Sequence, residues 1–214
     1  MSLREPKACV VDADIGVLEG GGSRYVKRLR DLEGLYADGA AFSALIQSDR
    51  DREVYEVTDC RPSTDSGDLI FGVTRMVPGR VGDEFFLTRG HIHANANRSE
   101  VYYGQKGHGV MLMESPAGET RTVEIRPGTV CYVPPFWIHR SINVGDEDLV
   151  MLFCFPADAG QDYEIIAGSG GMRHRVVAAD TADGWTLVDN ETYRPRGAAE
   201  LARRNLPSAG PTAS

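Results

Sequence analysis

The stretch Thr88-Arg89-Gly90-His91-Ile92-His93, followed closely by Glu100-Val101-Tyr102, carries the residues that decide the fold. In a β-strand, residues two apart point to the same face, so His91 and His93 can reach one ion. Ile92 would then turn into the opposite layer of a β-structure. The pair is therefore a candidate metal site on a strand.

Two further side chains extend this candidate site. The polar turn from Asn95 to Ser99 can return the chain and place Glu100 opposite the two histidines. His139 follows after a Pro134-Pro135 corner. Three imidazoles and one carboxylate suit Fe(II), Mn(II), Ni(II) or Zn(II), with open positions if the ion is six-coordinate.

The sequence around the candidate site has the pattern of short β-strands. Runs rich in Val, Tyr, Phe and Ile alternate with Gly, Pro and Asp clusters between about 54 and 166, which predicts an antiparallel barrel or sandwich. The expected strands are 53–57, 69–76, 84–88, 101–103, 109–113, 120–125, 129–133, 140–144 and 149–155, with a final pair at 173–178 and 184–188.

The two ends of the chain differ from this middle part. Residues 1–53 are expected to form an N-terminal extension with short helices packing on the barrel. Apolar residues at 25, 26, 29 and 32 predict one helix, and Asp38 is expected to cap a second. The barrel is expected to span 54–193. Residues 194–214 are expected to be a flexible tail, with one helical turn at 198–204 and disorder in the last eight residues.

Composition excludes several classes of protein. The 214 residues carry 31 acidic and 23 basic side chains, a net charge of -8, which argues against binding nucleic acid or anionic membranes through bulk charge. No apolar run approaches the roughly 18 residues of a membrane span, and the first ten residues lack the apolar core of a secretory leader. The four cysteines form no CxxC, which favours reduced thiols and a cytoplasmic location.

The wider spacing resembles a known pair of motifs. His91-x-His93, Glu100 and Gly107, and then Gly128, Pro134, His139 and Asn143, resemble the two cupin motifs in order. This resemblance implies an all-β cupin fold, the double-stranded β-helix or jelly-roll barrel. Phe85 and Phe136 stand where many cupins have glycine, and the gap before Glu100 is longer than in most.

Longer stretches resemble a narrower family, the cupin-type (archaeal-type) glucose-6-phosphate isomerases, over about 1–190. The matching stretches are 88–93, 100–102, 128–135 and 156–163. The resemblance implies a homodimer, one divalent metal ion and interconversion of glucose 6-phosphate and fructose 6-phosphate, a step of glycolysis and gluconeogenesis.

The resemblance also implies roles for individual residues. It assigns the metal ligands as His91, His93, Glu100 and His139. It assigns substrate or phosphate contacts to Thr74, Thr88, Gly90, Tyr102, Gln161 and Tyr163. Catalysis is expected to involve Glu100, Tyr102 and Tyr163. Gln161 and Phe155 depart from the histidine and tyrosine often found in the family, and glutamine cannot titrate near neutrality as histidine does.

Several alternatives stay open at this point. Fe2+ or Mn2+ is favoured over Zn2+ or Ni2+, but ligand identity alone does not select the ion. Glu100 either only binds the metal or also acts as a base, so a hydride shift and an enediol route both remain. On the enediol route, epimerisation toward mannose 6-phosphate also stays open. Arg89 or Arg98 can assist phosphate binding. The competing functions are a cupin dioxygenase-type metalloenzyme and a non-catalytic sugar-binding cupin.

Overall fold

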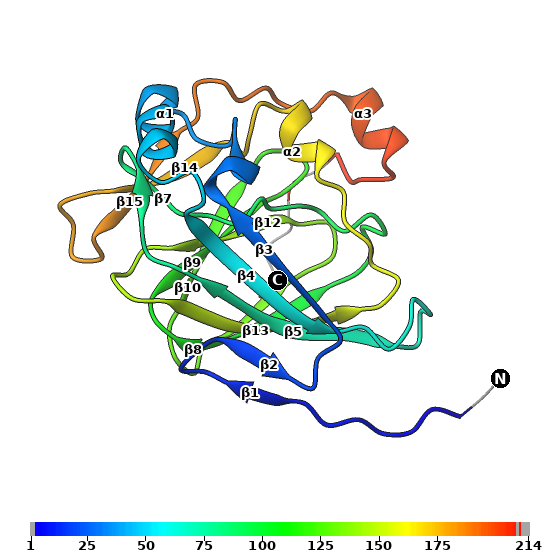
Figure 1. Cartoon of the computed structure of the whole chain (residues 1–214). Helices are drawn as coiled ribbons and strands as arrows, with labels where there is room; N and C mark the ends of the chain where they lie inside the picture. Colours follow the sequence, from blue (N-terminus) through cyan, green and yellow to red (C-terminus); the bar gives the residue numbers. More distant parts are fainter. Residues whose placement is uncertain (1–2, 209, 211–214) are drawn as a thin grey trace.

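The computed structural model describes residues 3–208 and 210, and antiparallel β-structure dominates it (Figure 1). One layer of the molecule is a six-stranded sheet. In spatial order its strands are β11 (Val130–Val133), β8 (Glu100–Lys106), β13 (Leu149–Pro156), β5 (Leu69–Met76), β4 (Glu53–Cys60) and β3 (Ser23–Arg28).

The second layer consists of two smaller sheets. The first contains β10 (Thr120–Ile125), β9 (Gly109–Glu114) and β12 (Ile138–Asn143). The other contains β15 (Trp185–Asp189), β14 (His174–Ala178), β7 (Glu84–Phe85) and β6 (Arg80–Val81). A single β-bridge between Leu87 and Ile142 joins them. Side chains from both layers form one hydrophobic cluster, which includes Ile70, Met111 and Met151. The all-β cupin barrel predicted from the sequence is therefore confirmed.

The remaining elements lie at the two ends of the barrel. Strands β1 (Val10–Asp12) and β2 (Val17–Glu19) form a hairpin at one end. The helices are the 3-10 helix η1 (Leu29–Leu32), α1 (Gly39–Ser48), α2 (Glu164–Gly168) and α3 (Ala198–Arg203). Figure 1 shows α1, and separately α2 and α3, at the opposite end from the hairpin. Within residues 3–208, no helix has the length and apolar character needed to cross a membrane.

Local sequence signals account for many of these boundaries. The Pro127-Gly128 turn connects β10 to β11: the Thr129 N–H donates to the Arg126 carbonyl at 2.9 Å, and Gly128 has a φ of 90°. Glycine adopts that conformation without steric cost. The predicted strands 69–76 and 120–125 are confirmed with the same bounds. The predicted cap is also confirmed, because the Asp38 carboxylate accepts the Ala41 N–H at 2.8 Å at the start of α1.

The helix predicted over 25–32 is wrong. Tyr25 pairs with Val57 and Lys27 pairs with Tyr55, so this segment is mostly strand β3, and only Leu29–Leu32 form a 3-10 helix. The apolar spacing fits a helix locally, but β4 offers an open row of backbone hydrogen-bonding groups that the segment can pair with. The extension thus adds a strand to the barrel besides packing one α-helix on it.

The C-terminal segment also differs from expectation over 194–206. The predicted helical turn is confirmed as α3, but Leu201 and Leu206 are buried in the main hydrophobic cluster, so this part packs on the barrel. The disorder expected for the last eight residues falls largely on 209 and 211–214, which lie outside the described residues. The division of the chain into extension, barrel and tail stays a prediction.

Candidate functional site

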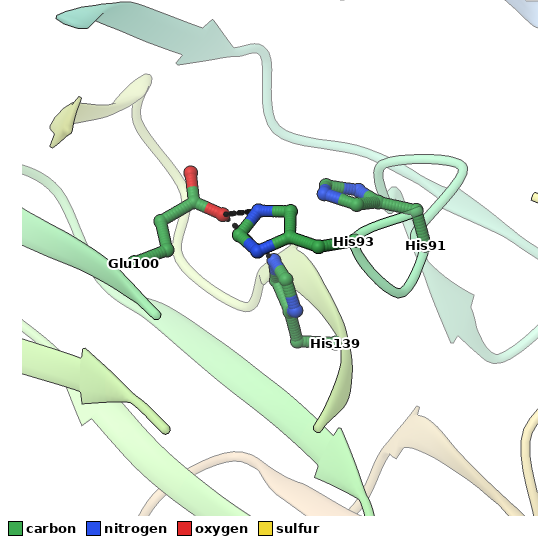
Figure 2. Close-up of side chains that lie close together, drawn as sticks. All are labelled: His91, His93, Glu100 and His139. Carbon is green, nitrogen blue, oxygen red and sulfur yellow. Dashed lines mark hydrogen bonds and ion pairs between the residues drawn. The ribbon is translucent and has the colours of Figure 1, made fainter. Parts of the chain in front are cut away.

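Four buried side chains converge inside the barrel, and Figure 2 shows them pointing toward one another. They are His91, His93, Glu100 and His139, and one ligand atom from each lies within 4.8 Å of the others. Glu100 begins β8, His139 lies on β12, and the two other histidines lie on the segment between β7 and β8. The structure thus brings together all four residues that the sequence indicated.

The segment that carries the first two histidines is held by single bridges on either side rather than by a regular strand. The His91 N–H donates to the His139 carbonyl at 3.0 Å, and the reverse bond is 2.9 Å. Ile92 is bridged in the same way to Asp162. Gly90 precedes the bridges with a φ of 73°, and a Cβ there would lie 2.9 Å from the Arg140 Cβ. A side chain at position 90 would therefore collide with β12.

The corner before β12 contains one departure from the cupin motif, Phe136 in place of glycine. Phe136 has a φ of 70°, in the left-handed region that residues other than glycine rarely adopt. Its N–H donates to the Ala96 carbonyl at 2.7 Å, so the corner is fixed to the loop after His93. A glycine would suit this backbone, which explains why a cupin can favour glycine here.

Backbone carbonyls orient two of the imidazoles. His93 Nδ1 lies 2.9 Å from the Arg98 oxygen, and His139 Nδ1 lies 3.2 Å from the Trp137 oxygen. Because a carbonyl only accepts, the hydrogen-bond network assigns the proton to Nδ1 in both rings. Both Nε2 atoms then face the centre, 3.3 Å and 3.0 Å from Glu100 Oε2.

The charges of the cluster follow from its burial. Burial alone would raise the pKa of Glu100, but the His139 and His93 rings, when each carries a second proton on Nε2 and donates it to Oε2, hold that pKa well below its ordinary value. Burial, reinforced by the nearby His139, lowers the pKa of His91 well below its ordinary value. The cluster therefore contains an ionised carboxylate and a neutral imidazole, which are the protonation states that bind a cation.

The donor set fits a divalent metal ion. His91 Nε2 is buried and has no hydrogen-bond partner among the described residues. A buried polar atom without a partner is costly, and a cation at the centre of the cluster would satisfy it. Three imidazoles and one carboxylate are suitable ligands for the borderline transition metals.

A cavity opens beside the cluster and collects most of the other predicted residues. The expected residues that line it are Thr74, Thr88, Gly90, His91, Glu100, Tyr102, His139, Gln161 and Tyr163. His93 is in the cluster but not among the lining residues. Sequence reasoning missed several others, namely Tyr25, Tyr55, Arg61, Arg140 and Phe153. His108 and His174 lie outside the site, paired with Glu124 and Asp189.

The structure distinguishes Arg89 from Arg98, the two arginines that the sequence left as alternatives for phosphate binding. Arg89 lines the cavity, whereas Arg98 forms a bidentate ion pair with Asp158 at 2.7 and 2.8 Å. Arg140 also lines the cavity; it is buried, and no carboxylate among the described residues pairs with it. Strand alternation would turn Arg140 away from the side of His139, so no sequence pattern indicated it.

Gln161 and Tyr163 form a polar wall of the cavity, and contacts with each other and with neighbouring side chains hold this wall in place. The Tyr163 hydroxyl donates to the Gln161 side-chain oxygen. The Arg89 guanidinium lies 4.4 Å from the centre of the Tyr163 ring, and that ring lies 6.0 Å from the ring of His91. Phe155 places its ring 5.5 Å from that of His93. Gln161 and Tyr163 thus form one side of the opening next to the metal ligands.

Comparison with known proteins places the chain in a family. A family model described as glucose-6-phosphate isomerase (GPI) matches residues 26–196. A glucose-6-phosphate isomerase from Sinorhizobium medicae is 60% identical over 200 residues, which cover 94% of this chain and 93% of that protein. A glucose-6-phosphate isomerase from Pyrococcus furiosus is 45% identical over 191 residues, which cover 89% and 98%. Among solved structures, an oxalate oxidase bound to glycolate covers 51% of this chain and 54% of its own, with 18% identity and a TM-score of 0.43. The sequence matches show that the chain belongs to the cupin-type glucose-6-phosphate isomerase family of enzymes.

Proposed function

We propose that this protein interconverts glucose 6-phosphate and fructose 6-phosphate, using one divalent metal ion bound by His91, His93, Glu100 and His139. The observation that carries the proposal is the buried cluster of these four side chains, which opens onto a cavity lined by hydroxyls and arginines. Family membership supports the choice of a sugar phosphate as substrate. We propose Fe2+ or Mn2+ as the native ion, with Zn2+ and Ni2+ as weaker candidates.

The bound cation would supply Lewis acidity, polarising the sugar oxygens on which charge develops. The side chains of the protein orient the substrate and determine which groups of the site carry a proton. Burial raises the pKa of Tyr102 well above its ordinary value, so this hydroxyl keeps its proton and serves as a neutral donor near Glu100. Glu100 is a weak base because its pKa is low, which supports a ligand role.

Two routes of hydrogen transfer lead to different labelling. An enediol route exchanges the migrating hydrogen with solvent, whereas a hydride shift between the two carbons retains it. Isomerisation in deuterated water followed by mass analysis of the product distinguishes them. We propose mannose 6-phosphate as a further substrate on the enediol route, because an enediol can be reprotonated on either face.

We propose that the phosphate is recognised by positive charge as well as by the hydroxyls of Thr74, Thr88 and Tyr163. Arg89 and Arg140 line the cavity and lack carboxylate partners among the described residues. An arginine and a phosphate form strong charge-assisted hydrogen bonds. Replacing Arg89 with glutamine is expected to raise KM for fructose 6-phosphate by about tenfold, the effect of losing one such bond.

Steady-state kinetics of the Arg89→Gln variant tests this prediction. Arg126→Gln is the matched control, because Arg126 is exposed and, among the described residues, forms an ion pair only with the nearby Glu124. Equal KM values in the two variants would contradict the role of Arg89 in phosphate binding.

Metal removal and reconstitution test the proposed function itself. The protein is stripped with a chelator and reloaded separately with Fe2+, Mn2+, Ni2+ or Zn2+, and conversion of fructose 6-phosphate is followed in a coupled assay. Activity is expected to disappear on stripping and to return with one or two of the ions, because the four ligands accept several divalent cations.

Other outcomes of the same experiment favour the competing functions. Protein that holds metal but converts no sugar phosphate would contradict the isomerase proposal. Oxygen consumption would then indicate a dioxygenase, and metal-dependent sugar binding without turnover would indicate a binding protein.

We propose that the active form is a cytoplasmic homodimer. Four apolar side chains alternate on the outer face of β8 and β11 and are exposed, with β11 at the edge of the six-stranded sheet. They are Val101, Tyr103, Val130 and Tyr132. Such a contiguous exposed apolar patch is typical of an association surface. The four free cysteines support a reducing compartment, and sedimentation analysis measures the oligomeric state.

A further inference from the structure

A short C-terminal segment contacts Asp162 in the pocket wall and lies beyond the residues that the family model matches. The family model ends at Arg196, whereas α3 spans Ala198–Arg203 and is followed by Arg204. The Arg204 guanidinium forms an ion pair with the carboxylate of Asp162. Asp162 stands between Gln161 and Tyr163, the two residues that line the cavity next to the metal ligands.

Asp162 connects three parts of the site through separate atoms. Its backbone pairs with Ile92, with hydrogen bonds of 3.2 Å and 2.8 Å, and Ile92 lies between the two histidines of the cluster. Its Oδ1 accepts the N–H groups of Glu164 and Ile165 at 2.9 Å and 3.3 Å, at the start of α2. Its Oδ2 contacts Arg204. A displacement of Asp162 therefore moves the pocket wall relative to the metal ligands.

The segment that carries Arg204 is itself anchored. Leu201 and Leu206 are buried in the main hydrophobic cluster on either side of Arg204. Asn205 ends the helical segment in the left-handed conformation, with a φ of 54°, which asparagine tolerates better than most residues. Arg204 is thus held in place by apolar packing and is not a side chain on a free tail.

We propose that Arg204 is a positioning residue: it fixes Asp162 and thereby holds Gln161 and Tyr163 against the metal-ligand cluster. This inference rests on the proposed isomerase function for its kinetic consequence. The ion pair thereby keeps the wall of Gln161 and Tyr163 ordered, although Gln161 replaces the histidine often found in the family. Arg204 acts through Asp162 and does not line the cavity.

The Arg204→Gln variant tests the proposal, with Arg203→Gln as its matched control. Arg203 is the preceding residue of the same helix, is exposed, and has no ion pair among the described residues. For Arg204→Gln we expect KM for fructose 6-phosphate to rise about three- to fivefold, the range for a partly exposed ion pair, with kcat and metal content unchanged. Arg204→Lys is expected to recover part of the loss because it keeps the charge.

A second measurement does not depend on activity. Hydrogen–deuterium exchange of the peptide containing 161–166 is expected to accelerate in Arg204→Gln and not in Arg203→Gln, because those amides are held through Asp162. An Asp162→Asn, Arg204→Gln double variant is expected to have a smaller effect than the sum of the two single changes, as for residues in direct contact.

The outcomes separate this inference from the proposed function. If the wild-type protein isomerises no sugar phosphate, the function is wrong, and exchange still decides whether Arg204 holds the wall. If Arg204→Gln matches Arg203→Gln in both KM and exchange, the positioning role is wrong. A fall in activity of Arg204→Gln that only parallels a loss of folded protein, with unchanged KM, also contradicts it.

Discussion

Replacement of His91 by alanine is expected to lower kcat/KM for fructose 6-phosphate by about a thousandfold or more. His91 supplies a neutral, buried Nε2 that has no other partner among the described residues. Loss of this ligand is expected to deplete the bound metal ion, and Lewis-acid stabilisation is worth several kcal/mol, with about 1.4 kcal/mol for each factor of ten. Metal content and steady-state kinetics measure the effect together.

The chain offers a matched control for this substitution. His108 is half-buried outside the cluster, and its Nε2 lies 3.5 Å from a Glu124 oxygen. His108→Ala is expected to retain the metal ion and nearly all activity. A His91→Ala protein that is folded, lacks the metal ion and still turns over at the wild-type rate would contradict the proposed metal dependence.

The second large effect is expected on stability, at the ion pair between Arg196 and Glu114. Both side chains are fully buried, and Glu114 also accepts the Arg173 N–H at 2.6 Å and the Tyr193 hydroxyl at 3.2 Å. Arg196→Met removes one partner and leaves a buried carboxylate without its cation. This change is expected to lower the free energy of unfolding by about 3–5 kcal/mol.

Denaturant unfolding of the Arg196→Met variant measures this loss. Arg121→Met is the control, because Arg121 and its partner Glu119 are both exposed and such pairs contribute little to stability. An Arg196→Met protein as stable as the control would show that the C-terminal segment does not depend on this pair.

The sequence predicted the chemistry of the centre better than the geometry around it. His91, His93, Glu100 and His139 could be found because a metal site needs particular donor atoms, and those atoms recur in a fixed order in a motif. Arg140 could not be found, because its contribution to the cavity depends on how β12 packs against the segment before His91. Gln161 was identified as a departure, and its bond with Tyr163, two residues further on, is a local contact that the sequence analysis did not predict.

The N-terminal segment shows the same limit in the fold. Residues 25–32 carry a helical pattern, yet most of them pair with β4 as a strand. Local periodicity describes which side of a segment is apolar, whereas the available hydrogen-bonding partners depend on the whole sheet. The C-terminal segment illustrates the opposite case: a stretch rich in Ala, Arg, Pro and Ser was predicted to be a flexible tail, whereas Leu201 and Leu206 are buried in the main hydrophobic cluster.

By itself, the sequence determined the all-β class, most of the strands and the four candidate metal ligands, because these depend on local alternation, turn residues and ligand chemistry. Only the tertiary structure decided which arginines face the cavity, which strand completes the six-stranded sheet, and that Arg204 reaches Asp162. The physical reason is that these contacts join residues far apart in the chain, and packing of the complete core, rather than any local pattern, determines which of them meet.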